Sequence, residues 1–207
     1  ADGSTSAPSI TNTGDLNTGM YFDGADSVAF TAGGTTRGAF NSGGLQVVGA
    51  LSANAATFTT ADNTDTLSLI STDADATQGP NLRLYRNSSS PADNDVLGVI
   101  EYEGRNDNSQ DVIYAQIGAQ ALDVSDGSED TNYFINTMVA GTLRNRINAL
   151  PTEVVVNQES QDLDFRVESD GYTNMLFVDG ENNRLGIANG SPAQSLDIGI
   201  GGLQIKG

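Results

Sequence analysis

Short runs in which apolar and polar residues alternate recur along the whole chain, and they restrict its fold more than any other feature. Successive side chains of a β-strand point to opposite faces, so this two-residue period predicts strands with one apolar face. Gly, Asn and Asp, which favour tight turns, bound the runs. The predicted strands cover residues 20–23, 27–32, 45–48, 66–70, 81–86, 96–103, 112–121, 133–140, 142–148, 153–156, 163–168, 175–178, 184–187, 195–198 and 203–205.

Helical patterns are weak by comparison. The nearest match is a helix of one or two turns around Leu51, Ala55 and Phe58. Asp outnumbers Glu and there is a single lysine, whereas exposed helix faces favour Glu, Lys and Arg. Hairpin turns are predicted at the Asp-Gly and Asn-Gly pairs 23–24, 126–127, 170–171, 179–180 and 189–190. The chain is therefore predicted to be all-β, with short antiparallel strands and hairpins.

The charge balance and two missing residue types exclude several functions. The 27 acidic and 9 basic residues give a formal net charge of −18. Such a chain repels phosphate backbones and anionic lipids, so we expect no nucleic acid partner and no membrane insertion. Cysteine and histidine are absent, which removes disulfides, the usual zinc ligands and histidine-dependent catalytic triads. The sequence predicts no cofactor and no metal site.

Two acidic segments were weighed as calcium sites. Asp73 and Asp75 begin like a calcium loop, but the glycine falls at Gly79 rather than at the sixth position. Leu84 stands at the twelfth position, where the loop needs an acidic residue. The acidic run at 123–130 is interpreted as a solvated hairpin turn.

A carboxylate pair raises the possibility of glycan hydrolysis. Glu101 and Glu103 lie two apart on a predicted strand, hence on one face and about 6–7 Å from each other. That separation is close to what an inverting glycosidase needs. Two glutamates on the outer face of an antiparallel strand are common, so no catalytic residue is assigned and the chain is expected not to be an enzyme.

The central block is the richest in groups suited to recognition. Arg83 and Tyr85 fall on one face of a predicted strand, and an outward Arg beside a Tyr suits sugar stacking or contact with a protein groove. The alternative is that Tyr85 covers the sheet while Arg83 pairs with an acid. The tentative receptor or glycan contacts are Arg83, Tyr85, Arg105 and Tyr114.

An internal repeat links the two ends of the chain. Three pieces match in order: MYFDG (20–24) with MLFVDG (175–180), SVAF (27–30) with RLGI (184–187), and GGLQVVG (43–49) with GGLQIKG (201–207). In both copies we expect the Leu and the Val or Ile of the last piece to point to the core or to a threefold axis. The Gln between them should face outward, and the glycines before them should form turns with a positive φ.

The repeat divides the chain into three expected parts. These are an N-terminal β shaft unit at 1–60, a central β domain at 61–160, and a C-terminal β shaft unit at 161–207 that is truncated or processed. Small β-repeats need stacking neighbours or partner chains to bury their apolar faces. Partner chains are therefore expected.

Several stretches resemble segments of tailed-bacteriophage fibres. SITNTGDLNTGMYF (9–22) and GGLQVVGALSANAATF (43–58) resemble repeating shaft segments, and the stretch starting with GPNLRLYR at Gly79 is similar to a domain that recurs in such fibres. LFVDGENNRLGIANGSPAQSLDI (176–198) looks like the segment that precedes a self-cleaving chaperone domain. The resemblance implies an elongated, intertwined homotrimer, with a chaperone tail released after Gly207 and no transferable catalytic residues.

The function implied by this resemblance is that of a structural fibre protein in the virion, on the tail or another surface fibre, with a contribution to host-surface attachment. Its expected partners are itself, other virion proteins, and a host surface glycan or protein. Two alternatives stay open. A tailspike-like glycan depolymerase would show a long regular repeat with clustered carboxylates, and a bacterial surface adhesin would carry a signal or anchor sequence.

Overall fold

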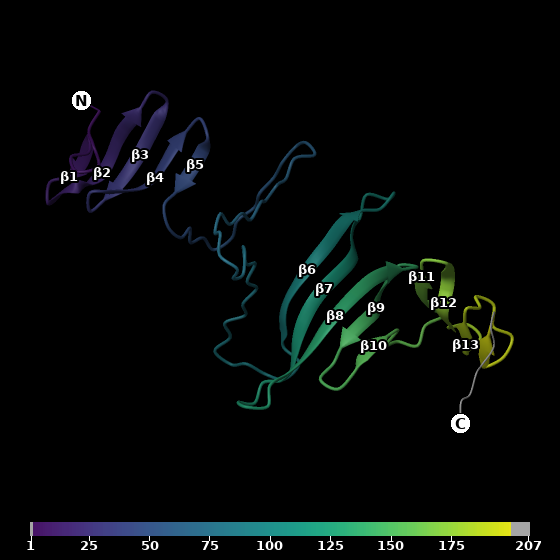
Figure 1. Ribbon diagram of the computed structural model, residues 1–207. Helices are drawn as coiled ribbons and strands as arrows, with labels where there is room; N and C mark the ends of the chain where they lie inside the picture. The colour runs from purple at the N-terminus through teal and green to yellow at the C-terminus, as the bar shows by residue number, and fades with distance from the viewer. Residues whose placement is uncertain (1, 200–207) are drawn as a thin grey trace. The chain divides into compact units, whose positions relative to one another are not determined.

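The computed structural model describes residues 2–199, which form three sheets made mostly of antiparallel strands (Figure 1). No helix occurs in this part of the chain, so the predicted all-β class is confirmed. The segment around Leu51, the nearest match to a helical pattern, is not helical. None of the described segments is a helix able to cross a membrane. The chain divides into two compact units, residues 1–80 and 81–207.

The first unit contains a five-stranded meander, in which each strand is antiparallel to the next. Its strands are Ile10–Asn12 (β1), Asp15–Gly24 (β2), Ser27–Ala32 (β3), Thr35–Asn41 (β4) and Gly44–Val47 (β5). Strands β1 and β4 were not predicted, because neither has an apolar run of its own. They form by pairing with the more apolar β2 and β3.

A small cluster on one face of this sheet contains its most buried apolar side chains. Tyr21, Ala29 and Ala39 are direct cross-strand neighbours on β2, β3 and β4, and all three are buried. The two alanines leave room for the ring, and the Tyr21 hydroxyl lies 2.7 Å from the Thr36 hydroxyl oxygen. The polar end of the tyrosine is thus satisfied while its ring is covered.

The opposite face of the same sheet is apolar and uncovered. Phe30 and Phe40 meet edge to face with ring centroids 6.2 Å apart, and Leu45 is the direct partner of Phe40. Leu45 is 57% exposed. It therefore points away from the buried cluster of this sheet. Of the two predicted directions, the core and a threefold axis, the second stays a prediction.

The turn before Leu45 has the predicted geometry, with Gly44 at a φ of 96°. Gln46 pairs with Ala39 and is exposed on the face of the buried cluster. The second copy of this piece, at 201–207, lies outside the described residues. The equivalence of the two copies at these positions stays a prediction.

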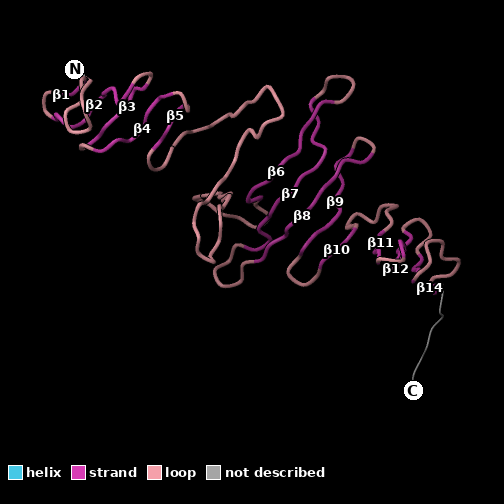
Figure 2. The backbone as a smooth tube through the Cα atoms, turned by 45° about the horizontal axis from the view of Figure 1, so that its top comes forward, coloured by secondary structure: helices cyan, strands magenta, loops and turns pink. Residues whose placement is uncertain are grey.

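Residues 48–95 contain no strand and run as the long loop between β5 and β6 (Figure 2). The strands predicted at 66–70 and 81–86 are therefore wrong. Both segments alternate correctly, but a strand also needs a partner for its backbone N–H and C=O groups. No other part of the described chain pairs with them.

The second unit begins with a five-stranded antiparallel sheet, in the spatial order β10-β9-β8-β7-β6 (Figure 1). Its strands are Val96–Arg105 (β6), Asp111–Asp123 (β7), Asp130–Val139 (β8), Thr142–Ala149 (β9) and Val154–Val156 (β10). The turn from β7 to β8 contains the predicted Asp126-Gly127 pair, with Gly127 at a φ of 85°. Glycine adopts this backbone without strain.

The third sheet departs from the predicted repeat after its central hairpin. Its strands are Phe165–Ser169 (β11), Tyr172–Asp179 (β12), Arg184–Ile187 (β13) and Leu196–Ile198 (β14). The β12–β13 hairpin corresponds to β2–β3, but β14 is parallel to β13 whereas β4 is antiparallel to β3. The hairpin turn predicted at Asn189-Gly190 is therefore wrong, because that pair lies in a connection between parallel strands.

Candidate functional site

One row of branched apolar side chains crosses all five strands of the central sheet. Ile100, Ile117, Ile135, Ile147 and Val156 are successive cross-strand partners from β6 to β10. Direct partners on antiparallel strands point to the same face. We call these five residues the isoleucine row. Ile100 is 41% exposed, and Ile147 and Val156 are 38% exposed.

The positions beside the isoleucine row on the same face carry no acidic side chain. Toward one end of the strands, the flanking cross-strand partners are Gly98, Ala119, Tyr133, Ala149 and Val154. Toward the other end they are Tyr102, Ala115, Thr137 and Arg144. In a chain of net charge −18, this face is distinguished by its lack of carboxylates.

The opposite face of the central sheet carries a hydrogen-bonded polar ladder. The Gln116 amide donates to Glu101 at 2.7 Å, and Asn136 donates to Gln116 at 3.4 Å. Asn145 then donates to Asn136 at 3.1 Å and to Asn148 at 2.7 Å. Most polar groups of the ladder are thus paired with one another, although Asn145 Oδ1 is buried without a hydrogen-bond partner. The ladder shares this face with Val99 and Phe134, which pack over Gly118.

The two glutamates considered for glycan hydrolysis lie on this polar side of the sheet. Glu101 is held by Gln116, and both Glu101 and Glu103 are exposed. The pairing of β6 with β7 shifts register between Tyr102 and Glu103, where Tyr114 is the extra residue. Glu101 is thus a member of the ladder, and the absence of catalysis stays a prediction.

Arg83 and Tyr85 lie together although their segment is not a strand. The Arg83 guanidinium carbon is 4.3 Å from the centroid of the Tyr85 ring, so the cation covers one face of the ring. On the other side of the segment, Leu84 packs at Gly98 of β6, where a Cβ atom would lie 3.0 Å from the Leu84 Cβ. The alternation predicted for this segment therefore holds without a sheet around it.

An ion pair fixes the end of this segment to the central sheet. Arg86 contacts Asp95 at 2.8 Å and also donates to the Val96 carbonyl oxygen at 3.1 Å. Asp95 in turn accepts from the backbone N–H of Ala92. These contacts close the loop that leads into β6.

Arg105 and Tyr114 lie at the far end of the β6–β7 hairpin. Arg105 pairs with Asp111 at 3.0 Å, and the Tyr114 ring packs at Gly104. Gly98 and Gly104 are six residues apart on one strand, about 20 Å. The structure thus brings the four tentative contact residues together as two separate pairs, and their role in recognition stays a prediction.

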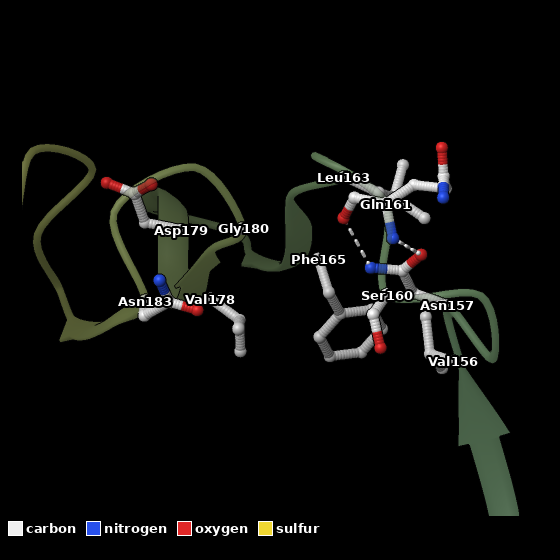
Figure 3. Close-up of a pocket in the computed structure, with 10 residues that line it drawn as sticks. All are labelled: Val156, Asn157, Ser160, Gln161, Leu163, Phe165, Val178, Asp179, Gly180 and Asn183. Carbon is white, nitrogen blue, oxygen red and sulfur yellow. Dashed lines mark hydrogen bonds between the residues drawn. The ribbon is translucent and has the colours of Figure 1, made fainter.

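A cavity of about 360 Å³ lies where β10 leads into the third sheet (Figure 3). Asn157 and Gln161 close the connecting loop, because Asn157 donates to the Gln161 carbonyl at 2.7 Å and accepts from its N–H at 2.9 Å. Asp179 is the only titratable residue in the lining. The Asn182 backbone N–H donates to Asp179 and holds the pKa of this carboxyl below its usual value, so the lining offers no acid–base pair.

The acidic segments form turns. The Asp123 carboxylate accepts from the Ser125 N–H at 2.7 Å, and the Gly127 N–H donates to Glu129 at 3.2 Å. Asp75 is bonded in the same way by Thr77. Within residues 2–199, no three Asp, Glu, His or Cys side chains gather in a manner that would hold a metal ion.

Glu159 ties the loop after β10 back to β9. Its pKa lies below the ordinary value, first because the Arg144 guanidinium donates to it at 2.8 Å and then because the Asn145 N–H does so at 3.2 Å. A folded pKa below the unfolded one means that this contact stabilises the loop above the unfolded pKa. The stabilisation is lost as the pH falls through the folded pKa.

We therefore expect Glu159→Gln to speed amide exchange at Asn145 near neutral pH. On acidification the exchange rate of the wild-type chain at Asn145 should approach that of the variant, because Glu159 of the wild type becomes protonated. The measurement is the ratio of the two exchange rates by NMR across the acid range. A ratio that does not change with pH would contradict this account.

The sequence matches no protein-family model and no curated protein. The likeness to fibre segments is therefore carried by the short motifs quoted above. Function is inferred from those motifs and from the chemistry of the sheet faces.

Proposed function

We propose that the chain is a structural, non-enzymatic fibre protein of a bacteriophage virion that works as an elongated homotrimer. The supporting observation is the amount of surface that it leaves uncovered. Its accessible surface is 15349 Å², whereas two separate compact domains of the same total mass would expose about 11,000 Å².

Many large apolar side chains lie on this uncovered surface, and the chain alone does not bury them. No large side chain in the described part is fully buried, and the substantial contacts between strands all fall within single sheets. Ordering a residue costs about 1–2 kcal/mol of backbone entropy, and apolar burial at about 25 cal/mol per Å² must offset that cost. Partner chains that cover these faces would supply the missing burial.

The polar features suit a protein displayed on a particle surface. The polar ladder ends in the exposed carboxylate of Glu101, and the net charge of −18 opposes lateral association of neighbouring fibres. In this proposal the chain contacts other virion proteins at its base and a host surface glycan or protein elsewhere. The resemblance to phage shaft segments supports the virion location.

The expected result for the purified chain is a trimer of three times the 21.5 kDa chain mass. Sedimentation equilibrium and native mass spectrometry at micromolar concentration would measure it. A folded monomer would contradict the proposal, because the apolar faces would then stay exposed in the stable state.

The virion assignment needs a separate experiment. Antibodies raised against the chain should label fibres on phage particles in immunogold electron microscopy. Release of reducing ends from host polysaccharide by the purified protein would favour the depolymerase alternative.

A further inference from the structure

We infer that the isoleucine row is the face through which a second copy of this chain docks on the central sheet. The inference rests on the proposed oligomer and assigns a surface to it. Three features of the central sheet support it: the charge of the face, its geometry, and the coverage that the chain itself provides.

Charge decides where two copies can approach each other. Two chains of net charge −18 repel over most of their surfaces, and like charges brought together at an interface are costly. The isoleucine row and its flanking partners contain no carboxylate. The cations beside the row are occupied, since Arg144 pairs with Glu159 at 2.8 Å and Arg146 donates to the Thr137 hydroxyl at 2.6 Å. The row itself can therefore pack on another copy without opposing carboxylates, and the one carboxylate at its Arg144 edge, Glu159, is already paired.

The geometry of the row suits packing of one sheet on another. Five strands spaced by about 4.8 Å give a row about 19 Å wide, and sheets pack face to face about 10 Å apart with interdigitating side chains. A stable interface needs about 800 Å² from each partner, and the chain exposes about 4,000 Å² more than two compact domains would. The row is then the centre of a contact that extends over its apolar flanking partners on the central sheet, such as Tyr102 and Tyr133.

The chain itself covers only one end of the row. Leu84 lies with Ile100, Ile117 and Tyr133 around a cavity at the Gly98 end of the sheet. Ile147 and Val156, on the strands farther from Leu84, stay exposed. In the proposed homotrimer the corresponding rows of the other copies cover this remainder, because their side chains are equally apolar.

Adjacent residues on β6 provide a matched test. Ile100 belongs to the row, whereas Val99 lies on the opposite face, and the two are 41% and 38% exposed. We expect Ile100→Glu to weaken self-association at least tenfold and Val99→Glu to change it less than about twofold, as measured by sedimentation equilibrium. Far-UV circular dichroism would check that both variants keep their β-structure. Equal effects of the two substitutions would overturn the inference.

Cysteine labelling tests the same face without adding charge. The natural chain has no cysteine, so Ile100→Cys and Val99→Cys each introduce a single thiol. In the assembled protein a maleimide should react with the thiol at position 100 at least tenfold more slowly than with the thiol at position 99. Equal rates in an intact oligomer would overturn the docking face but leave the proposed oligomer standing. Slow labelling at position 100 in a protein that sediments as a monomer would mean that the chain covers the row itself, which also overturns the inference.

Discussion

Tyr21→Ala is expected to lower the stability of the N-terminal sheet by about 3–5 kcal/mol, the range for removing a large aromatic side chain from a packed site. Tyr21 is 6% exposed and is the only large apolar side chain in the buried cluster of this sheet. Its alanine neighbours on β3 and β4 are too small to fill the space that the ring would leave. Loss of the ring should therefore weaken the pairing of β2 with β3 and of β3 with β4.

Hydrogen exchange of the full-length chain, followed by mass spectrometry at increasing urea concentration, would measure this effect on peptides from β2 to β4. Tyr21→Phe is the matched control, because it keeps the ring and removes only the hydroxyl that lies 2.7 Å from Thr36. Loss of that hydrogen bond should cost about 0.5–1.5 kcal/mol. Unchanged protection in Tyr21→Ala would mean that the cluster does not stabilise this sheet.

Gly19→Ala is expected to cost about 1–3 kcal/mol or more and to detach β1 from β2. A Cβ atom at Gly19 would collide with the backbone carbonyl oxygen of Ile10, and a main-chain atom within a ladder cannot move away as a side chain can. Gly24 is the control on the same strand, because a Cβ there meets no atom within 4 Å. Replacing it by alanine should be neutral or slightly stabilising.

The measurement for this pair is the thermal unfolding midpoint together with amide exchange at Ile10–Asn12. Gly19→Ala should lower the midpoint and expose the amides of β1, while Gly24→Ala should leave both near the wild-type values. The same response in both variants would show that general glycine flexibility, and not the close approach of β1, limits stability here.

The sequence by itself determined the fold class and most of the strands. Strands β3 and β13 have the predicted bounds, 27–32 and 184–187, and the Asp170-Gly171 pair forms the predicted turn between β11 and β12. These features are readable because alternation and turn chemistry act between near neighbours in the chain. Residues two positions apart in a strand point to the same face, so a short stretch of sequence already shows which face is apolar.

The tertiary structure decided which extended segments became strands. Strand β4 has no apolar run, yet it pairs with β3 and places Ala39 beside the buried cluster. Segments 66–70 and 81–86 alternate well but find no partner in the described chain and stay irregular. The alternation of apolar residues also did not predict that β14 pairs in parallel with β13. Formation of these strands depends on pairing with a segment that lies elsewhere in the sequence, and the local pattern of apolar residues does not predict which segment that is.

The candidate surface shows the same division. Each isoleucine of the row lies in its own predicted strand, but isoleucine is common in strands, whereas Arg83, Tyr85, Arg105 and Tyr114 are the less common side chains suited to recognition. Alignment of the row across five strands depends on registers that shift at Tyr102/Glu103 and at Ile135/Asn136. A slip of one residue would turn a strand's apolar side chains to the opposite face. The alternation could therefore predict that an apolar face exists, while only the pairing of the strands decided which residues share it.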